Sequence, residues 1–336
     1  DEVATIVGDI GADTCKFGYG GEDSPKHVFL STAGYLPGNT SIKEGMNKAT
    51  TTTTAQGGSA AMDVDGGGGG AAGGAGGRAK AKNNEGGGRG ESGRWLVGDL
   101  AVSRRRDGME MRSPLVDGLL SDWDQVEKLW EHAFRDRLRA VASERPVLVA
   151  EASWSTAKER RGLMELMFEK FGVPAMFPAK NAMLSAFSAG RATALVCDCG
   201  HGATSAVPVV DGFVLNRAVQ RGIRGGDWLT QQTNAHLAVG VGVGVGAATS
   251  GGLASLVVLE LHVREKGKAG GGGAAAKPEP FPGTTLSYAN HMRMEIVREL
   301  KETCMSIPLE DSGSSSEEDE GRETKYTLPD GTDIEV

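Results

Sequence analysis

This sequence of 336 residues has no apolar run long enough to cross a membrane and no N-terminal pattern typical of a secretory signal peptide. We therefore expect no membrane association. It also has no excess of positive charge, because the formal net charge is −8. That balance argues against general or sequence-specific DNA binding and is compatible with basic protein partners.

Cysteine is scarce and shows no Cys-x-x-Cys spacing; the residues are Cys15, Cys197, Cys199 and Cys304. We interpret them as reduced thiols, as is typical of a cytosolic or nuclear protein. Cys197 and Cys199 together offer two metal ligands, but packing at the end of a strand is the favoured interpretation.

Glycine is abundant, with 51 residues concentrated in a few tracts. A Thr-, Gly- and Ala-rich stretch covers 38–94, Val alternates with Gly over 239–252, and 267–277 is Gly and Ala. These stretches lack the apolar periodicity that would offset chain entropy, so we expect insertions without a core. The Ser-rich acidic segment 311–323 reads as a solvated loop in preference to a kinase site.

Patterned segments lie between these tracts. Short apolar runs predict strands at 4–7, 146–150 and 194–197. Apolar residues at helical spacing predict helices at 123–138, 158–171, 179–189 and 294–304. Ser121 or Asp122 is available to cap the first helix. The inward-facing residues expected in the second and last helices are Leu163, Leu166, Met167 and Phe168, then Ile296, Val297 and Leu300. Strands alternating with helices predict an α/β fold around a mixed sheet.

Two loops carry the main chemical signal. The sequence Asp-Ile-Gly-Ala-Asp-Thr begins at Asp9, and Asp-Cys-Gly-His-Gly-Ala-Thr begins at Asp198, each after a short apolar run. Such turns expose successive backbone N–H groups to phosphate oxygens, and the Asp can hold water on a divalent metal. One Asp-x-Gly is uninformative, since both residues are common in turns. Two copies, each followed by another apolar strand, suggest a duplicated fold that clamps a phosphate between its halves.

At this level of detail the sequence resembles actins and actin-related proteins. The match begins with DIGADTCKFGYGGEDSP at 9–25. Six further motifs follow in the same order: WDxxEKxW (123–130), PVLxxEA (146–152), MFE (167–169), PAM (174–176), EIVRELKE (295–302) and YxLPDG (326–331). The resemblance implies the actin-like duplicated nucleotide-binding fold that hexokinase and Hsp70 share.

Other segments are similar to the nuclear actin-related proteins of chromatin-remodelling and histone acetyltransferase complexes. They are 113–123, with Arg106 and Met109 before it, then Trp154 and 226–230. This implies a non-catalytic nuclear subunit that contacts actin, a helical scaffold segment of a remodelling ATPase or acetyltransferase subunit, and histones. The low-complexity stretch replaces the flexible tip of the actin filament subunit, so we expect little filament formation.

The resemblance also implies a domain plan. The small domain begins with 1–37, which carries phosphate loop 1, is interrupted by the insertion 38–94 and ends with 95–178. Residues 179–225 form the core of the large domain with phosphate loop 2, and 226–336 form its peripheral subdomain. The family's second adenosine-binding turn lies beyond 328–331, so we expect the closing C-terminal segments to be absent from this sequence.

ATP with Mg²⁺ or Ca²⁺ is the implied ligand. The implied nucleotide-binding residues are Asp9, Gly11, Ala12, Asp13, Lys16, Asp198, Gly200, His201, Gly202, Ala203, Lys301 and Glu302. In this assignment Asp9 and Asp198 hold the metal through water, while Gly11, Gly200 and Gly202 present N–H groups. Lys16 reaches the β- and γ-phosphates. Lys301 and Glu302 lie near the adenosine, although by themselves they read as an exposed pair on an amphipathic helix.

Several positions depart from actin. We align Glu165 and Ser205 with the Gln and His that position the hydrolytic water, Asp13 replaces a Gly, and His201 replaces an Asp. Added carboxylates beside a γ-phosphate are repelled, so we expect slow or absent hydrolysis. The alternatives are a cytoskeletal actin-like ATPase, which needs an ordered tip and a water-positioning Gln, and a sugar kinase or chaperone-type ATPase, which leaves the tryptophan helix unexplained.

Overall fold

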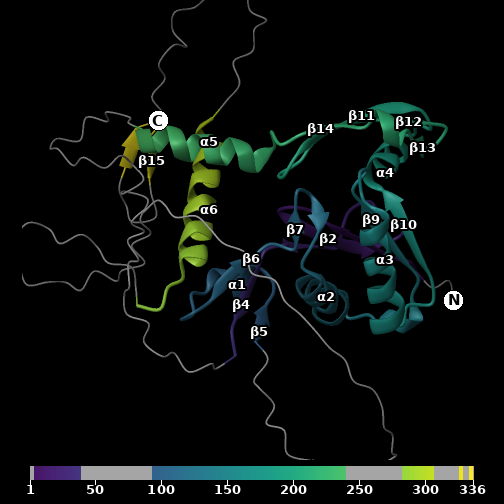
Figure 1. The fold of residues 1–336 in the computed structure, drawn as a ribbon, viewed down its shortest axis with the longest axis horizontal. Coiled ribbons are helices and arrows are strands. Elements are labelled where there is room, and N and C mark those ends of the chain that lie inside the picture. Colours follow the sequence, from purple (N-terminus) through teal and green to yellow (C-terminus); the bar gives the residue numbers. More distant parts are fainter. Residues whose placement is uncertain (1–3, 39–92, 240–281, 306–324, 328–332, 336) are drawn as a thin grey trace, which may run out of the picture. The chain divides into compact units, whose positions relative to one another are not determined.

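The computed structural model describes residues 4–38, 93–239, 282–305, 325–327 and 333–335 (Figure 1). The Gly-rich stretches, the acidic segment 311–323 and residues 328–331 lie almost entirely outside these ranges. Within the described residues, no helix combines the length and the apolar character needed to span a bilayer.

The largest sheet has five strands in the order β10-β9-β1-β2-β3. The strands are β1 (Ile6–Ile10), β2 (Thr14–Tyr19), β3 (His27–Leu30), β9 (Val147–Glu151) and β10 (Met176–Lys180). β1, β2 and β3 form an antiparallel meander, whereas β9 and β10 run parallel to β1. The sheet packs on helices through a core that includes Ile6, Phe17, Phe29, Leu129, Trp130, Val147 and Met167.

Two predicted helices form where the apolar spacing places them. α2 (Trp123–Glu131) continues as a π-helix over His132–Leu138, and Asp122 caps it by accepting from the Gln125 N–H at 3.0 Å. α3 (Ala157–Glu165) continues as a π-helix over Leu166–Lys170. The inward position predicted for Phe168 is wrong, since its side chain is 45% exposed. A π-turn closes over five residues, so the 3.6-residue spacing that placed Phe168 inside no longer applies.

The other two helices have different starts from those predicted. α4 (Asn181–Ser188) begins two residues late because Ala179 and Lys180 extend β10. α6 (Leu286–Cys304) begins eight residues early, capped by Thr285. Ile296, Val297 and Leu300 of α6 are buried, as predicted.

A second sheet repeats the strand–loop–strand plan of β1 and β2. It contains β11 (Ala194–Cys199), β12 (Thr204–Val210), β13 (Phe213–Val214) and β14 (Gln220–Gly222). α4 packs Ala182 and Ala186 onto Val207 and Val209 of β12. Asp9 and Asp198 lie inside β1 and β11, so each predicted strand is longer than its apolar run and takes in the aspartate.

Smaller elements complete the described chain. A three-stranded sheet holds β4 (Ala33–Leu36), β5 (Arg94–Leu96) and β6 (Glu110–Arg112), with α1 (Asp99–Ser103) beside β4. β7 (Leu115–Val116) pairs with β8 (Leu119–Leu120), and β15 (Lys325–Thr327) pairs with β16 (Asp333–Glu335). α5 (Gly226–Val239) packs against α6 (Figure 1).

Candidate functional site

The two predicted phosphate loops share one construction. In loop 1, defined here as Gly11–Thr14, the Gly11 N–H donates to the Thr14 carbonyl at 3.1 Å. In loop 2, Gly200–Ala203, the Gly200 N–H donates to the Ala203 carbonyl at 3.0 Å. Both loops join antiparallel strands, and Asp9 pairs in register with Lys16 as Asp198 pairs with Ser205. The same local turn therefore occurs twice, which is the geometry of a duplicated fold.

The turn geometry corrects one prediction about backbone donors. The N–H groups of Gly11 and Gly200 close their own turns, so they do not face a ligand. In loop 2, the carbonyls of Gly200 and His201 accept from the first N–H groups of α5, those of Gly226 at 3.0 Å and Asp227 at 2.8 Å. A trans peptide points its N–H away from its carbonyl. The N–H groups of His201 and Gly202 therefore point away from α5.

Loop 1 is held from behind by Ser31. The Ser31 hydroxyl donates to the Gly11 carbonyl at 2.7 Å, and its N–H donates to the Asp13 carbonyl at 2.9 Å. By the same peptide geometry, the Ala12 N–H points away from Ser31. In the described chain the N–H groups of Ala12, His201 and Gly202 donate no hydrogen bond, so three backbone donors remain available for an anion.

Ser31 has its own buried supports. The Gln125 amide donates to the Ser31 carbonyl at 3.0 Å and to the Arg112 carbonyl at 2.9 Å. The Cys15 sulfur lies 3.2 Å from the Ser31 hydroxyl, and burial raises the pKa of the Cys15 thiol to about 12. Nothing in the local sequence around Ser31 or Gln125 marks these roles, which depend on contacts distant in sequence.

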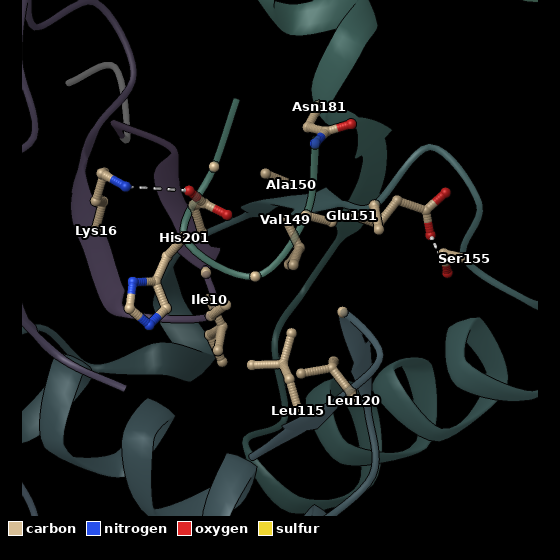
Figure 2. Close-up of a pocket in the computed structure, with 18 of the residues that line it drawn as sticks. Ile10, Lys16, Leu115, Leu120, Val149, Ala150, Glu151, Ser155, Asn181 and His201 are labelled. Carbon is tan, nitrogen blue, oxygen red and sulfur yellow. Dashed lines mark hydrogen bonds and ion pairs between the residues drawn. The ribbon is translucent and has the colours of Figure 1, made fainter. Parts of the chain in front are cut away.

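The loops border a cavity of about 500 Å³. It is lined by most of the predicted residues, namely Asp9, Gly11, Ala12, Asp13, Lys16, Asp198, Gly200, His201, Gly202 and Ala203. Figure 2 shows Lys16 and His201 on one side, Glu151 and Ser155 on the other, and Leu115 and Leu120 at a third wall. The cavity thus has a polar end at the loops and apolar groups beside it.

The two aspartates at the loops, Asp9 and Asp198, influence each other electrostatically. Lys16 Nζ lies 3.8 Å from Asp9 Oδ2. Burial raises the pKa of Asp9 above its usual value, Lys16 opposes this, and the nearby charge of Asp198 adds to it. A cation near the two carboxylates would reverse the rise. Among the described residues, no group of three or more His, Cys, Asp and Glu side chains gathers as metal ligands.

Facing the loops is a charge network around the buried carboxylate of Glu151, which sequence patterns do not reveal. Glu151 accepts hydrogen bonds from Arg160 and from Lys180, whose Nζ lies 3.1 Å from Glu151 Oε1. Burial alone would raise the pKa of Glu151, but these two cations outweigh it and lower the pKa. The Asn181 Oδ1 accepts from the Ser153 hydroxyl at 2.7 Å and from the Ala182 N–H at 2.8 Å.

The prediction that Glu165 takes the place of the Gln that positions the hydrolytic water is wrong. Glu165 ends α3 as an exposed residue, whereas Glu159, Arg160 and Leu163 of the same helix line the cavity. The first turns of α3, rather than its last residue, face the loops. Asn181, at the start of α4, also lines the cavity and was not among the predicted site residues (Figure 2). Ser205 is buried beside Asp198 and does not line the cavity.

Lys301 and Glu302 do not line the cavity. Lys301 donates to the Gly226 carbonyl at 3.1 Å and to the Thr230 hydroxyl at 2.9 Å. Glu302 accepts from Arg298 Nε at 3.1 Å. Their contact with adenosine stays a prediction.

Comparison with known proteins identifies this arrangement. The profile of the Actin family matches residues 1–336. The chain belongs to the actin family. Its α/β structure, with the strand–loop–strand unit repeated around one cavity, is the actin-like nucleotide-binding fold.

Among curated proteins the chain is similar to plant actin-related proteins. It is 50% identical over 230 residues to Actin-related protein 4 of Arabidopsis thaliana, a match that covers 68% of this chain and 47% of that protein. The proteins of the same name from Oryza sativa subsp. indica and subsp. japonica are 38% identical over 232 residues, with the same shares covered. The chain spans about half the length of these relatives.

Proposed function

We propose that the cavity binds the phosphates of ATP together with Mg²⁺ or Ca²⁺. The observation that carries this proposal is the pair of facing loops, with free N–H groups on Ala12, His201 and Gly202 and the ammonium of Lys16 beside them. Backbone N–H groups in such turns bind anions, and lysine binds phosphate as a point charge. Asp9 and Asp198 would hold the cation through water, and the cation would neutralise phosphate charge.

We infer that the bound nucleotide has a structural role and that hydrolysis is slow or absent. A general base must be free to accept a proton from water. Glu151 is engaged by Arg160 and Lys180, and Glu159 accepts the Leu120 N–H at 2.8 Å and the Thr156 N–H at 2.9 Å. Asn181 uses its oxygen internally and offers the cavity an NH₂ group, which donates and takes no proton.

We further propose that the protein is a nuclear, non-catalytic subunit of a chromatin-remodelling or histone acetyltransferase complex. The similarity to Actin-related protein 4 supports this assignment. Actin and a helical scaffold segment of the ATPase or acetyltransferase subunit are the proposed partners, and the net charge of −8 suits contact with basic histones. The alternative is a cytoskeletal actin-like ATPase.

Calorimetric titration with Mg·ATP tests the nucleotide site. Lys16→Met should weaken binding at least tenfold, whereas Lys158→Met, on the exposed face of α3, should leave it unchanged. Equal binding by both variants would exclude the loops as the site. Single-turnover phosphate release as fast as that of conventional actin would overturn the non-catalytic role.

A pull-down from nuclear extract, with partners identified by mass spectrometry, tests the complex. Monomeric actin together with a remodelling ATPase or acetyltransferase scaffold would support the nuclear subunit. Recovery of filament-binding proteins without chromatin proteins would favour the cytoskeletal alternative.

A further inference from the structure

An ion pair links loop 1 to a helix far away in the sequence. Arg298 of α6 lies 2.7 Å from Asp13 through Nη1 and Oδ1, and the two side chains are 25% and 21% exposed. Arg298 also pairs with Glu302 at 3.1 Å and lies 3.7 Å from Glu295. Within the described chain, Arg298 is the cation paired with Asp13.

This pair bears on the charge of the cavity. Asp9, Asp13 and Asp198 all line the cavity, while Lys16 is already shared with Asp9. A polyphosphate placed at loop 1 would meet an uncompensated carboxylate at Asp13 unless another cation neutralised it, because like charges at contact distance repel. Arg298 supplies that cation without itself lining the cavity.

The same helix also reaches loop 2. Lys301, three residues after Arg298 and therefore on the same side of α6, donates to the carbonyl of Gly226. The N–H of Gly226 in turn donates to the carbonyl of Gly200 in loop 2. One helix face is thus connected to both loops, directly through Asp13 and indirectly through the first turn of α5.

We propose that Arg298 is a positioning residue that neutralises Asp13 and, with Lys301, holds the two loops at the spacing a polyphosphate needs. This inference rests on the proposed nucleotide site. It explains how a loop with an added carboxylate accepts an anion. Loss of Arg298 leaves the negative charge of Asp13 to repel the polyphosphate. Loss of both charges removes this repulsion.

A double-mutant cycle on the full chain tests this proposal, with the Kd for Mg·ATP and the Tm of the ATP-free protein as readouts. Arg298→Met should weaken binding at least tenfold, and adding Asp13→Asn to Arg298→Met should recover most of that loss. The double variant should bind within threefold of Asp13→Asn. Arg298→Lys, which keeps the charge, should recover most of the affinity, and Arg161→Met, an exposed residue of α3, is the control.

The Tm cycle should show non-additivity without ATP, because the ion pair between Arg298 and Asp13 connects two elements of the fold directly. A double variant as weak as Arg298→Met would instead mean that Arg298 contacts phosphate directly, and tighter binding by Arg298→Met would mean that the pair obstructs the site. Either result overturns the proposal. Failure of the unmodified chain to bind Mg·ATP would overturn the nucleotide site itself, a separate outcome.

Discussion

Gly202 of loop 2 faces Ala12 of loop 1 so closely that a Cβ on Gly202 would lie 3.0 Å from the Cβ of Ala12. Gly202→Ala should therefore push the loops apart by a few tenths of an ångström. Because N–H donors must sit at hydrogen-bond distance from the ligand, we expect Mg·ATP affinity to fall about threefold to tenfold, which corresponds to about 1 kcal/mol. Calorimetric titration measures the change.

The matched control removes the neighbour. Adding Ala12→Gly to Gly202→Ala eliminates the close contact and should restore most of the affinity. Persistence of the full loss in the double variant would show that the effect of Gly202→Ala lies in its own backbone.

Gly225 offers a second test of loop 2. A Cβ at Gly225 would lie 2.6 Å from the His201 carbonyl oxygen and 2.7 Å from that of Gly200, so backbone must move to admit it. Gly225→Ala should displace the first turn of α5 from the loop, lower Tm and weaken Mg·ATP binding at least fivefold. Gly222, where a Cβ meets nothing within 4 Å, is the control. Equal effects of Gly225→Ala and Gly222→Ala would contradict the role of the α5 contact.

The predictions that succeeded depend on local sequence. The apolar runs at 4–7 and 194–197 located β1 and β11, although both strands extend past the predicted ends, and Asp122 acts as the cap of α2 because capping involves only the next few residues. The predicted inward orientation of Phe168 is wrong because the helix changes its period at Leu166, and the spacing of apolar residues in the sequence does not reveal that change.

The parts of the site that sequence missed depend on contacts between distant segments. Arg298 and Asp13 are 285 positions apart in the sequence, and Gln125 donates a hydrogen bond to Ser31, which lies 94 positions away. The N–H groups of Gly11 and Gly200 are engaged because the turns close, which the residue types alone do not specify. The sequence therefore predicts the position of the two loops. The N–H groups that are available to a ligand, and the residues that hold the loops in place, can be identified only from the folded structure.

Gln125 should matter for stability and for loop 1 together. It is fully buried, and its amide satisfies the carbonyls of Ser31 and Arg112. Gln125→Met leaves both carbonyls without this donor, so we expect the free energy of unfolding to fall by about 2 kcal/mol. Urea denaturation measures this loss, and Mg·ATP affinity should fall as well because Ser31 holds loop 1. Gln231→Met, on the exposed surface of α5, should change neither quantity.

Glu151 should make stability depend on acid pH. Its side chain is 6% exposed and accepts from Arg160 and Lys180, which lower its pKa below the usual 4.5. A carboxyl whose pKa is lower in the folded state stabilises above its unfolded pKa, and this stability is lost as pH falls through the folded pKa. Glu151→Gln removes the carboxylate from both pairs, while Lys180 keeps the Ala152 carbonyl at 3.2 Å and the Arg160 side chain is 41% exposed, so unfolding at pH 7 should become easier by about 2 kcal/mol.

The difference in free energy of unfolding between the unmodified chain and Glu151→Gln should persist down to about pH 4.5. Below that pH the difference should narrow, because protonation of Glu151 removes the same charge from the unmodified chain. Urea titrations from pH 7 to pH 3 measure the gap. Glu165→Gln is the matched control, because Glu165 is exposed at the end of the same helix that carries Arg160. A gap that stayed constant to pH 3 would show that Glu151→Gln destabilises through packing rather than through the lost ion pairs.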